Sequence, residues 1–251
     1  QQAILDLEQS LKKYPNNALL KISLVLHQAH INLRNNPSNT EELCKKLLQD
    51  IEGMECPYHE YLQIHVDILI AEFYAKKYEQ CLSDCEKVSQ MAHSLGAAYQ
   101  IGRLLNIKAS CQLIFHSYYE AEKNYERSIV EFSESGNSLL GWRALFNKAQ
   151  LYLCEGKKSK ALKIFNELYN GIIPNLTERM TYISLDNTEF VAFLYTVRIL
   201  IENKQYKENA TVKLFLPNKT YTDIVNMSSE EFYEAMNKLS YIHNDCLIIL
   251  G

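Results

Sequence analysis

The segment KKYEQC at residues 76–81 aligns with HSYYEA at residues 116–121 and with GKKSKA at residues 156–161. The offset between neighbouring segments is forty residues each time. Each segment begins with polar residues typical of a short connection and ends on a small residue, which favours a turn that leads into a helix. A repeat of this length predicts a chain assembled from copies of one supersecondary unit.

The alignment continues along the helix that follows each turn. Four residues after the small positions 81, 121 and 161 come Cys85, Tyr125 and Phe165, and seven residues after the small positions come Val88, Ser128 and Leu168. Residues at these spacings share one face of a helix. Twelve residues before each small position stand Leu69, Ala109 and Ala149, inside apolar segments with helical periodicity. Each unit is therefore predicted to be a helix, a short turn and a second helix.

This spacing resembles the tetratricopeptide (TPR) repeat, whose pattern places small and aromatic residues at fixed steps along two helices, here called helix A and helix B. The resemblance implies an all-α fold: a right-handed α-solenoid of antiparallel helix pairs with repeats of about forty residues. The usual TPR period is about 34 residues. Repeats with a length nearer forty residues resemble, more loosely, those in the ligand-sensing domains of bacterial peptide-responsive regulators.

Carried along the chain, the resemblance divides it into two regions. Residues 1–170 are expected to hold the TPR-like repeats, with the register fading beyond Gly171–Pro174. Residues 171–251 are expected to hold a degenerate helical repeat and a C-terminal capping helix. Because residues 1–15 match helix B of a truncated repeat, we expect Gln1 to fall inside a longer protein. The four repeats within the first region are expected at about 17–54, 58–95, 98–135 and 138–170.

Composition excludes several classes of protein. The 251 residues carry 26 Lys and Arg against 30 Asp and Glu, a net charge of −4, so no basic surface for direct nucleic-acid binding is expected. The longest apolar runs fall short of the roughly 18 residues of a membrane span, and we expect no membrane contact. Seven scattered cysteines do not form a disulfide framework. This favours an intracellular location, cytoplasmic or, in a eukaryote, nuclear.

The resemblance also implies where a ligand would bind, because helix A of each TPR unit lines a concave surface. Three of the six arginines fall at positions of helix A that would line this surface. Two of them, Arg103 and Arg143, are again forty residues apart. Guanidinium groups bind carboxylates with two parallel hydrogen bonds, and Asn or Gln amides can pair with a peptide backbone. The alternative is a solvated polar face without function. The predicted ligand-binding residues are Gln63, Asp67, Arg103, Asn106, Ser110, Arg143, Asn147, Gln150, Tyr195 and Arg198.

No enzyme motif is found in the sequence. Gly156-Lys157-Lys158-Ser159 lacks the upstream glycine of a phosphate-binding loop, and the Cys56–His59 region with His65 does not gather a compact set of four metal ligands. We therefore predict a non-enzymatic chain without cofactor or metal, which binds a protein or an extended peptide in its groove. Two alternatives stay open, the peptide-sensing half of a transcriptional regulator and a structural subunit of a multiprotein complex. A homodimer through the C-terminal helices is a further alternative.

Overall fold

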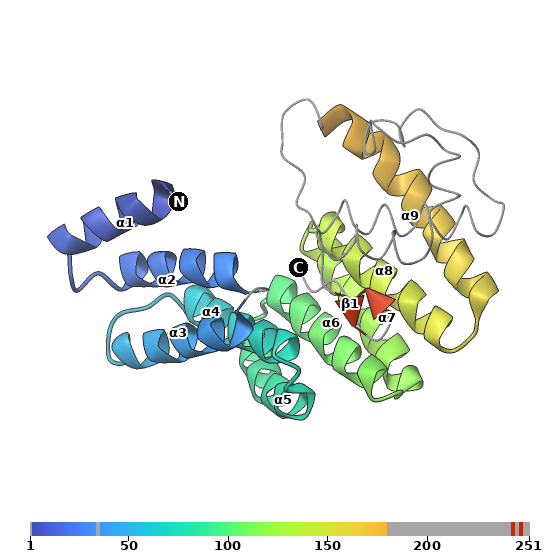
Figure 1. The fold of residues 1–251 in the computed structure, drawn as a ribbon, viewed down its shortest axis with the longest axis horizontal. Helices are drawn as coiled ribbons and strands as arrows, with labels where there is room; N and C mark the ends of the chain where they lie inside the picture. Colours follow the sequence, from blue (N-terminus) through green and yellow to red (C-terminus); the bar gives the residue numbers. More distant parts are fainter. Residues whose placement is uncertain (1, 34–35, 180–241, 244–245, 248–251) are drawn as a thin grey trace. The chain divides into compact units, whose positions relative to one another are not determined.

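Helices of equal length follow one another at twenty-residue intervals through the middle of the chain (Figure 1). The computed structural model describes residues 2–33, 36–179, 242–243 and 246–247. Within them, the prediction of an all-α fold built from helix pairs is confirmed. The elements are α1 (Gln2–Lys13), α2 (Ala18–Asn32), α3 (Pro37–Asp50), α4 (Tyr58–Tyr74), α5 (Tyr78–Ser94), α6 (Ala98–Ile114), α7 (Tyr118–Glu134), α8 (Ser138–Cys154), α9 (Lys158–Arg179), β1 (Ile242–His243) and β2 (Cys246–Leu247).

The chain divides into two compact units, residues 1–116 and 117–251. In the first unit each helix from α1 to α6 packs on the next, and α4 also contacts α6. In the second unit α8 lies against α7 and α9. Strands β1 and β2 pair antiparallel, with Ile242 opposite Leu247, and β2 contacts α8.

Packing follows the predicted repeat positions. The small residues Cys81, Ala121 and Ala161 are all 0% exposed, which lets the two helices of each pair approach closely. The Cys81 thiol lies 3.3 Å from the backbone carbonyl of Leu69 on α4, so helices α4 and α5 come into direct contact there. In the second unit the rings of Phe146 on α8 and Phe165 on α9 meet edge to face, with centroids 5.7 Å apart.

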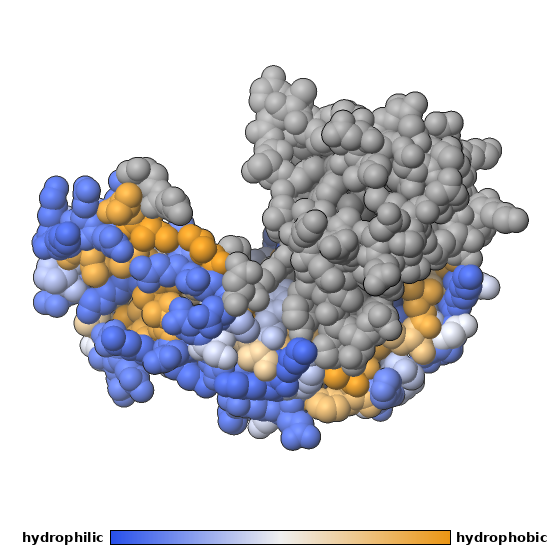
Figure 2. Space-filling view, viewed as in Figure 1, coloured by the Kyte–Doolittle hydropathy of each residue, from blue (hydrophilic) through white to orange (hydrophobic). Residues whose placement is uncertain are grey.

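Hydrophobic side chains also reach the surface at the N-terminal end of the chain. Figure 2 shows hydrophobic surface over helices α1 and α2, where Leu5, Leu19 and Ile31 are 51%, 47% and 57% exposed. None of the described helices is long and apolar enough to cross a membrane. Helix α9 continues through Pro174 to Arg179, so the backbone helix extends past the point where the sequence register fades.

The turns repeat as regularly as the helices. A residue with positive φ lies two positions after the end of each of the helices α4, α5, α6, α7 and α8, at positions 76, 96, 116, 136 and 156. At Lys76 the amide of Lys77 donates to the Glu72 carbonyl at 2.9 Å and the amide of Lys76 donates to the Phe73 carbonyl at 3.0 Å. This is the Schellman arrangement that closes the C-terminus of a helix. Glycine occupies three of the five positions, and Lys76 and His116 hold the same conformation with a side chain.

We predict that Lys76→Gly raises the free energy of unfolding by about 0.5–1 kcal/mol, because a side chain at φ 62° is strained and glycine is not. The matched control is Gly96→Ala, at φ 61° in the same unit. A Cβ added there meets no atom within 4 Å, so only the backbone conformation is tested. Gly96→Ala should lower stability by about 1 kcal/mol. Urea denaturation measures both, and a loss of stability in Lys76→Gly would contradict this account of the turn.

Candidate functional site

Four polar side chains on two consecutive A helices form one hydrogen-bonded group in the first unit. We call Gln63 and Asp67 on α4, with Gln100 and Arg103 on α6, the polar ladder. The Gln63 amide donates to Asp67 Oδ1 at 2.8 Å, and the Gln100 amide donates to Gln63 Oε1 at 2.7 Å. Arg103 Nη1 donates to Gln63 Oε1 at 2.7 Å, while Nη2 donates to Asp67 Oδ1 at 3.1 Å. The structure thus brings together three residues predicted from their spacing.

The ion pair of the polar ladder is largely withdrawn from water. The side chains of Arg103 and Asp67 are 6% and 13% exposed. Burying both charges is tolerated because several hydrogen bonds satisfy the pair at once. The guanidinium also lies over the Tyr99 ring, 5.7 Å from its centroid. Among the described residues no group donates to Asp67 Oδ2, so this oxygen keeps its capacity to accept a hydrogen bond.

The remaining predicted residues of α6 are part of the interior. Asn106 is 1% exposed and Ser110 is 0% exposed. The Ser110 hydroxyl donates to the Asn106 backbone carbonyl at 2.8 Å, a bond within one helix turn. These two side chains are therefore not part of a solvent-exposed polar face, which was the alternative to a binding surface.

The predicted residues of α8 lie in the second unit. Arg143, Asn147 and Gln150 share one face of the helix and are 8%, 0% and 0% exposed. Neither amide atom of Gln150 has a hydrogen-bond partner within the described part of the chain. A buried amide without partners is unfavourable by roughly 1–3 kcal/mol, which makes Gln150 an unexplained polar group in this unit. Tyr195 and Arg198 lie outside the described residues.

Sequence reasoning missed Gln100 and Tyr99 as neighbours of Arg103. Gln100 precedes Arg103 by three residues, a spacing that places both on one helix face. That signal was available in the sequence. The contact of the Arg103 guanidinium with the Tyr99 ring was not, because it depends on the rotamers of both side chains.

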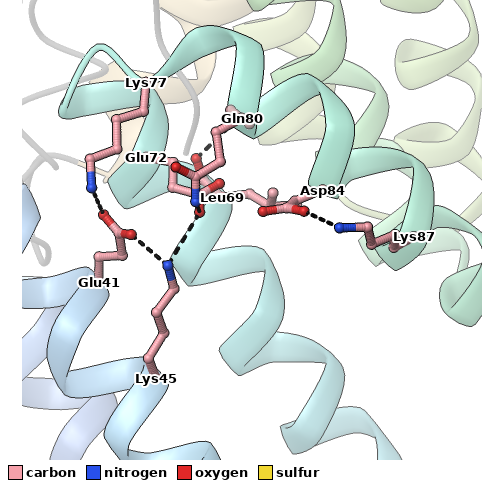
Figure 3. Close-up of polar contacts among 9 residues, drawn as sticks. Glu41, Lys45, Leu69, Glu72, Lys77, Gln80, Asp84 and Lys87 are labelled. Atoms are coloured by element: carbon pink, nitrogen blue, oxygen red, sulfur yellow. Dashed lines mark hydrogen bonds and ion pairs between the residues drawn. The ribbon is translucent and has the colours of Figure 1, made fainter.

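A second group of charged residues, which the sequence analysis did not identify, joins α3, α4 and α5 (Figure 3). Lys45 Nζ lies 2.6 Å from Glu41 Oε1, and Lys77 Nζ lies 2.8 Å from Glu41 Oε2. The Gln80 amide donates to Glu72 Oε1 at 2.7 Å, and Lys45 approaches the same oxygen only to 3.7 Å. We call these five residues the charged cluster. Lys77 directly precedes α5, the other four residues lie on α3, α4 and α5, and all five belong to the first unit.

The two carboxyl groups of the charged cluster behave differently. Burial, followed by repulsion from Asp84, raises the pKa of Glu72 to about 7. Burial also opposes ionisation of Glu41, but hydrogen bonds from Lys45 and Lys77 outweigh it and hold the pKa of Glu41 below its ordinary value. Glu41 is therefore the carboxylate that the two lysines neutralise, and Glu72 is the one that they leave largely uncompensated.

The buried thiols lack the features of a reactive site. Cys81 and Cys85 are both 0% exposed, and a hydrogen bond with Cys111 together with burial raises the pKa of the Cys81 thiol far above its usual range. A thiol that stays protonated is a poor nucleophile. Among the described residues no group of three or more His, Cys, Asp or Glu side chains could hold a metal ion.

Comparison with solved structures identifies the fold. The chain is similar to BtubC (BKLC) from P. vanneervenii, with a TM-score of 0.58 and 11% identity over 99% of this chain and 94% of that one. It also matches a putative kinesin light chain of Podosopora anserina, described as having nearly identical TPR-like repeats, with a TM-score of 0.49 and 10% identity over 85% and 92% of the two chains. The chain has a TPR-like repeat fold. No protein-family model and no curated protein sequence matches it.

The TPR-like fold explains why the polar ladder lies where it does. In such a repeat, the A helices α4 and α6 are neighbours, and their contact is present in the structure. Residues forty apart therefore stand at corresponding steps of adjacent A helices. Gln63 and Arg103 are forty residues apart, and their side chains are directly bonded at 2.7 Å.

Proposed function

We propose that this chain is a non-enzymatic scaffold that holds a protein or an extended peptide against its A helices, with the polar ladder as a point of attachment. TPR-like folds generally mediate protein interactions, and this supports the coarse assignment. The proposal that the partner attaches at the polar ladder rests on the environment of Asp67 Oδ2. It is an acceptor on a partly exposed carboxylate, held in place by its neighbours and without a donor among the described residues.

The chemistry of the polar ladder suits a peptide backbone. Gln63 and Arg103 both bind Oδ1 of Asp67, which fixes the carboxylate plane and leaves Oδ2 oriented before any ligand arrives. A preorganised acceptor loses little entropy on binding, so its hydrogen bond contributes more to affinity. A backbone N–H or another donor of the partner is the natural complement of Oδ2.

The A helix of the second unit offers a comparable group. Gln150 holds both a donor and an acceptor without partners in the described structure, and a peptide group needs one of each. Because Gln150 is 0% exposed, a peptide reaches this amide only when the residues that cover it move aside. We propose that Arg143, Asn147 and Gln150 form the corresponding attachment point on α8. Tyr195 and Arg198 stay predicted members of the same surface.

The experiment that tests this function is Asp67→Asn in the full-length protein, with the partner identified by mass spectrometry of protein purified from its own source. Because Oδ1 must still accept from Gln63 and Arg103, the new amide nitrogen replaces Oδ2. The acceptor thereby becomes a donor, and a peptide N–H no longer fits. The variant also removes the counter-charge of the buried Arg103, so binding is measured under conditions where circular dichroism shows Asp67→Asn to be folded.

We expect the dissociation constant for the identified partner to rise about tenfold or more in Asp67→Asn, the effect of losing one hydrogen bond to a charged group. The matched control is Asp50→Asn, an exposed residue at the end of α3, which should bind as the wild type does. Equal affinity of both variants would contradict the proposal. A short peptide as the partner would favour the sensor half of a regulator, and whole proteins would favour a scaffold or a structural subunit.

A further inference from the structure

A cavity of about 260 Å³ lies between α3, α4 and α5, away from the polar ladder. On α4, consecutive residues are turned by about 100°, so His65, Ile68, Leu69 and Glu72 point roughly opposite to Gln63 and Asp67. The cavity and the polar ladder therefore occupy different sides of the same helix. A ligand of the cavity would therefore contact other residues of α4 than a partner bound at the ladder.

The lining of the cavity combines an apolar floor with a few polar groups. Apolar side chains come from all three helices: Leu48, Ile68, Leu69, Val88 and Met91. The polar members are Lys45, His65, Glu72, Asp84 and Lys87. Pockets for drug-sized molecules have volumes of roughly 300–1,000 Å³. This cavity is smaller and suits a short aliphatic molecule or a single side chain.

Two buried polar atoms in this lining have no hydrogen-bond partner. They are Oε2 of Glu72, whose side chain is 0% exposed, and Nε2 of His65. Each such atom has lost the hydrogen bond that water would give it, and this loss is larger for a charged group. Both belong to α4, with Ile68 and Leu69 between them. A ligand that gives Glu72 a donor and covers these apolar residues would remove the larger of the two penalties.

The charges around the cavity show which donor Glu72 lacks (Figure 3). Lys45 and Lys77 are bonded to Glu41 at 2.6 and 2.8 Å, and Lys87 is bonded to Asp84 at 2.7 Å. Among the described residues, Lys45 brings its ammonium group near Glu72. Its Nζ lies 3.7 Å from Glu72 Oε1, which is too long for a hydrogen bond. The carboxyl of Glu72 therefore lies close to cations that are already engaged elsewhere.

We propose that this cavity binds a primary alkylammonium group, whose hydrocarbon stem covers Ile68, Leu69 and Val88 and whose ammonium donates to Oε2 of Glu72. A free aliphatic amine and the lysine side chain of a partner protein share this chemistry. Both carry a compact cation on a flexible aliphatic stem. Displacement of the Lys45 ammonium toward solvent, where its side chain is already 46% exposed, opens the path to Glu72.

The probes are n-pentylamine, 1-pentanol and pentanoate, which have similar stems and carry a positive, zero and negative charge at neutral pH. Each is titrated into the full chain, and binding is followed by NMR of the methyl groups of Leu48, Ile68, Leu69 and Val88. We expect pentylamine to shift these signals with a dissociation constant at least tenfold lower than that of pentanol, and pentanoate not to bind. Equal binding of pentanol and pentylamine, or no shift with any probe because the cavity holds only water, would overturn the proposal.

Two blocked amino acids distinguish the sources of the amine. If the ligand is a partner's lysine, N-acetyl-lysine-N-methylamide should bind as pentylamine does, and the norleucine analogue, which lacks the amine, should not. If the ligand is a free amine, pentylamine alone should bind. Either result supports an alkylammonium site.

Variants test the assigned contacts. Glu72→Gln should weaken pentylamine binding at least tenfold and leave pentanol unaffected, while Glu42→Gln, exposed on α3, should bind as the wild type. Lys45→Met removes the ammonium that competes for Glu72 and should tighten pentylamine binding several-fold. A merely damaged fold would not produce opposite changes in two variants. Unchanged affinity in both Glu72→Gln and Lys45→Met would overturn the assignment.

Discussion

Arg103→Ala should lower the free energy of unfolding by about 3–5 kcal/mol, the effect of removing one partner from a buried ion pair. The variant leaves Asp67, with a side chain only 13% exposed, as an uncompensated charge. It also leaves Gln63 Oε1 with one donor where it had two. Hydrogen exchange should place the loss in α4 and α6, the two helices that the pair connects.

Two comparisons make the Arg103 prediction specific. Arg103→Lys keeps the charge but lacks the two-pronged geometry that joins Gln63 to Asp67, so it should lose an intermediate amount of stability. Arg127→Ala, at an exposed position of α7, should change stability by less than about 0.5 kcal/mol. Urea denaturation followed by circular dichroism measures all three. If Arg103→Ala and Arg127→Ala were alike, the polar ladder would not exist in solution.

The second large effect concerns Glu72 and depends on pH. Its pKa is raised to about 7 in the folded chain from an ordinary value near 4.5. The folded state therefore binds more protons than the unfolded state between these values. The stability that Glu72 contributes is present in full below pH 4.5 and is lost as the pH rises through 7.

Glu72→Gln removes this titration and keeps an oxygen that can accept from Gln80. The variant should gain stability relative to the wild type as the pH rises from about 4.5 to 8. The difference should grow by roughly 3 kcal/mol over that range, since each pKa unit corresponds to about 1.4 kcal/mol. Glu42→Gln, at an exposed position of α3, is the control for the removal of one carboxyl group. Parallel stability curves for Glu72→Gln and the wild type between pH 5 and 8 would show that Glu72 titrates normally.

The sequence predicted much of the fold because the repeat fixes which side chains face inward. The small residues at 81, 121 and 161 are all buried, as are Cys85, Tyr125 and Phe165 four positions later. The twenty-residue spacing of individual helices was not predicted. Its signal was present, since Gly96, Gly136 and Gly156 mark three of the five turns, but Lys76 and His116 conceal the other two.

The candidate site was predicted less completely. Spacing placed Gln63, Asp67 and Arg103 on facing helices, and the structure brings them together. Spacing does not report how closely two helices approach, so the burial of Arg103 and its pairing with Asp67 could not be derived. Glu72 was overlooked even though it stands in the apolar run 68–74. A lone acid in such a run indicates a buried carboxyl group. That the nearby lysines bind Glu41 and not Glu72 could not be predicted, because it depends on how α3, α4 and α5 pack together.

The central claim is that a partner binds against α4 and α6 beside the polar ladder, and photo-cross-linking in the native cell tests it most directly. A photoreactive phenylalanine analogue replaces Tyr99, the half-buried ring beside Arg103, or, as controls, the exposed Tyr58 and Tyr119, which are 71% and 75% exposed. We expect position 99 to cross-link to one protein or peptide, and Asp67→Asn to abolish this product. Cross-links from position 58 or 119 to a stoichiometric partner, with none from position 99, would contradict it.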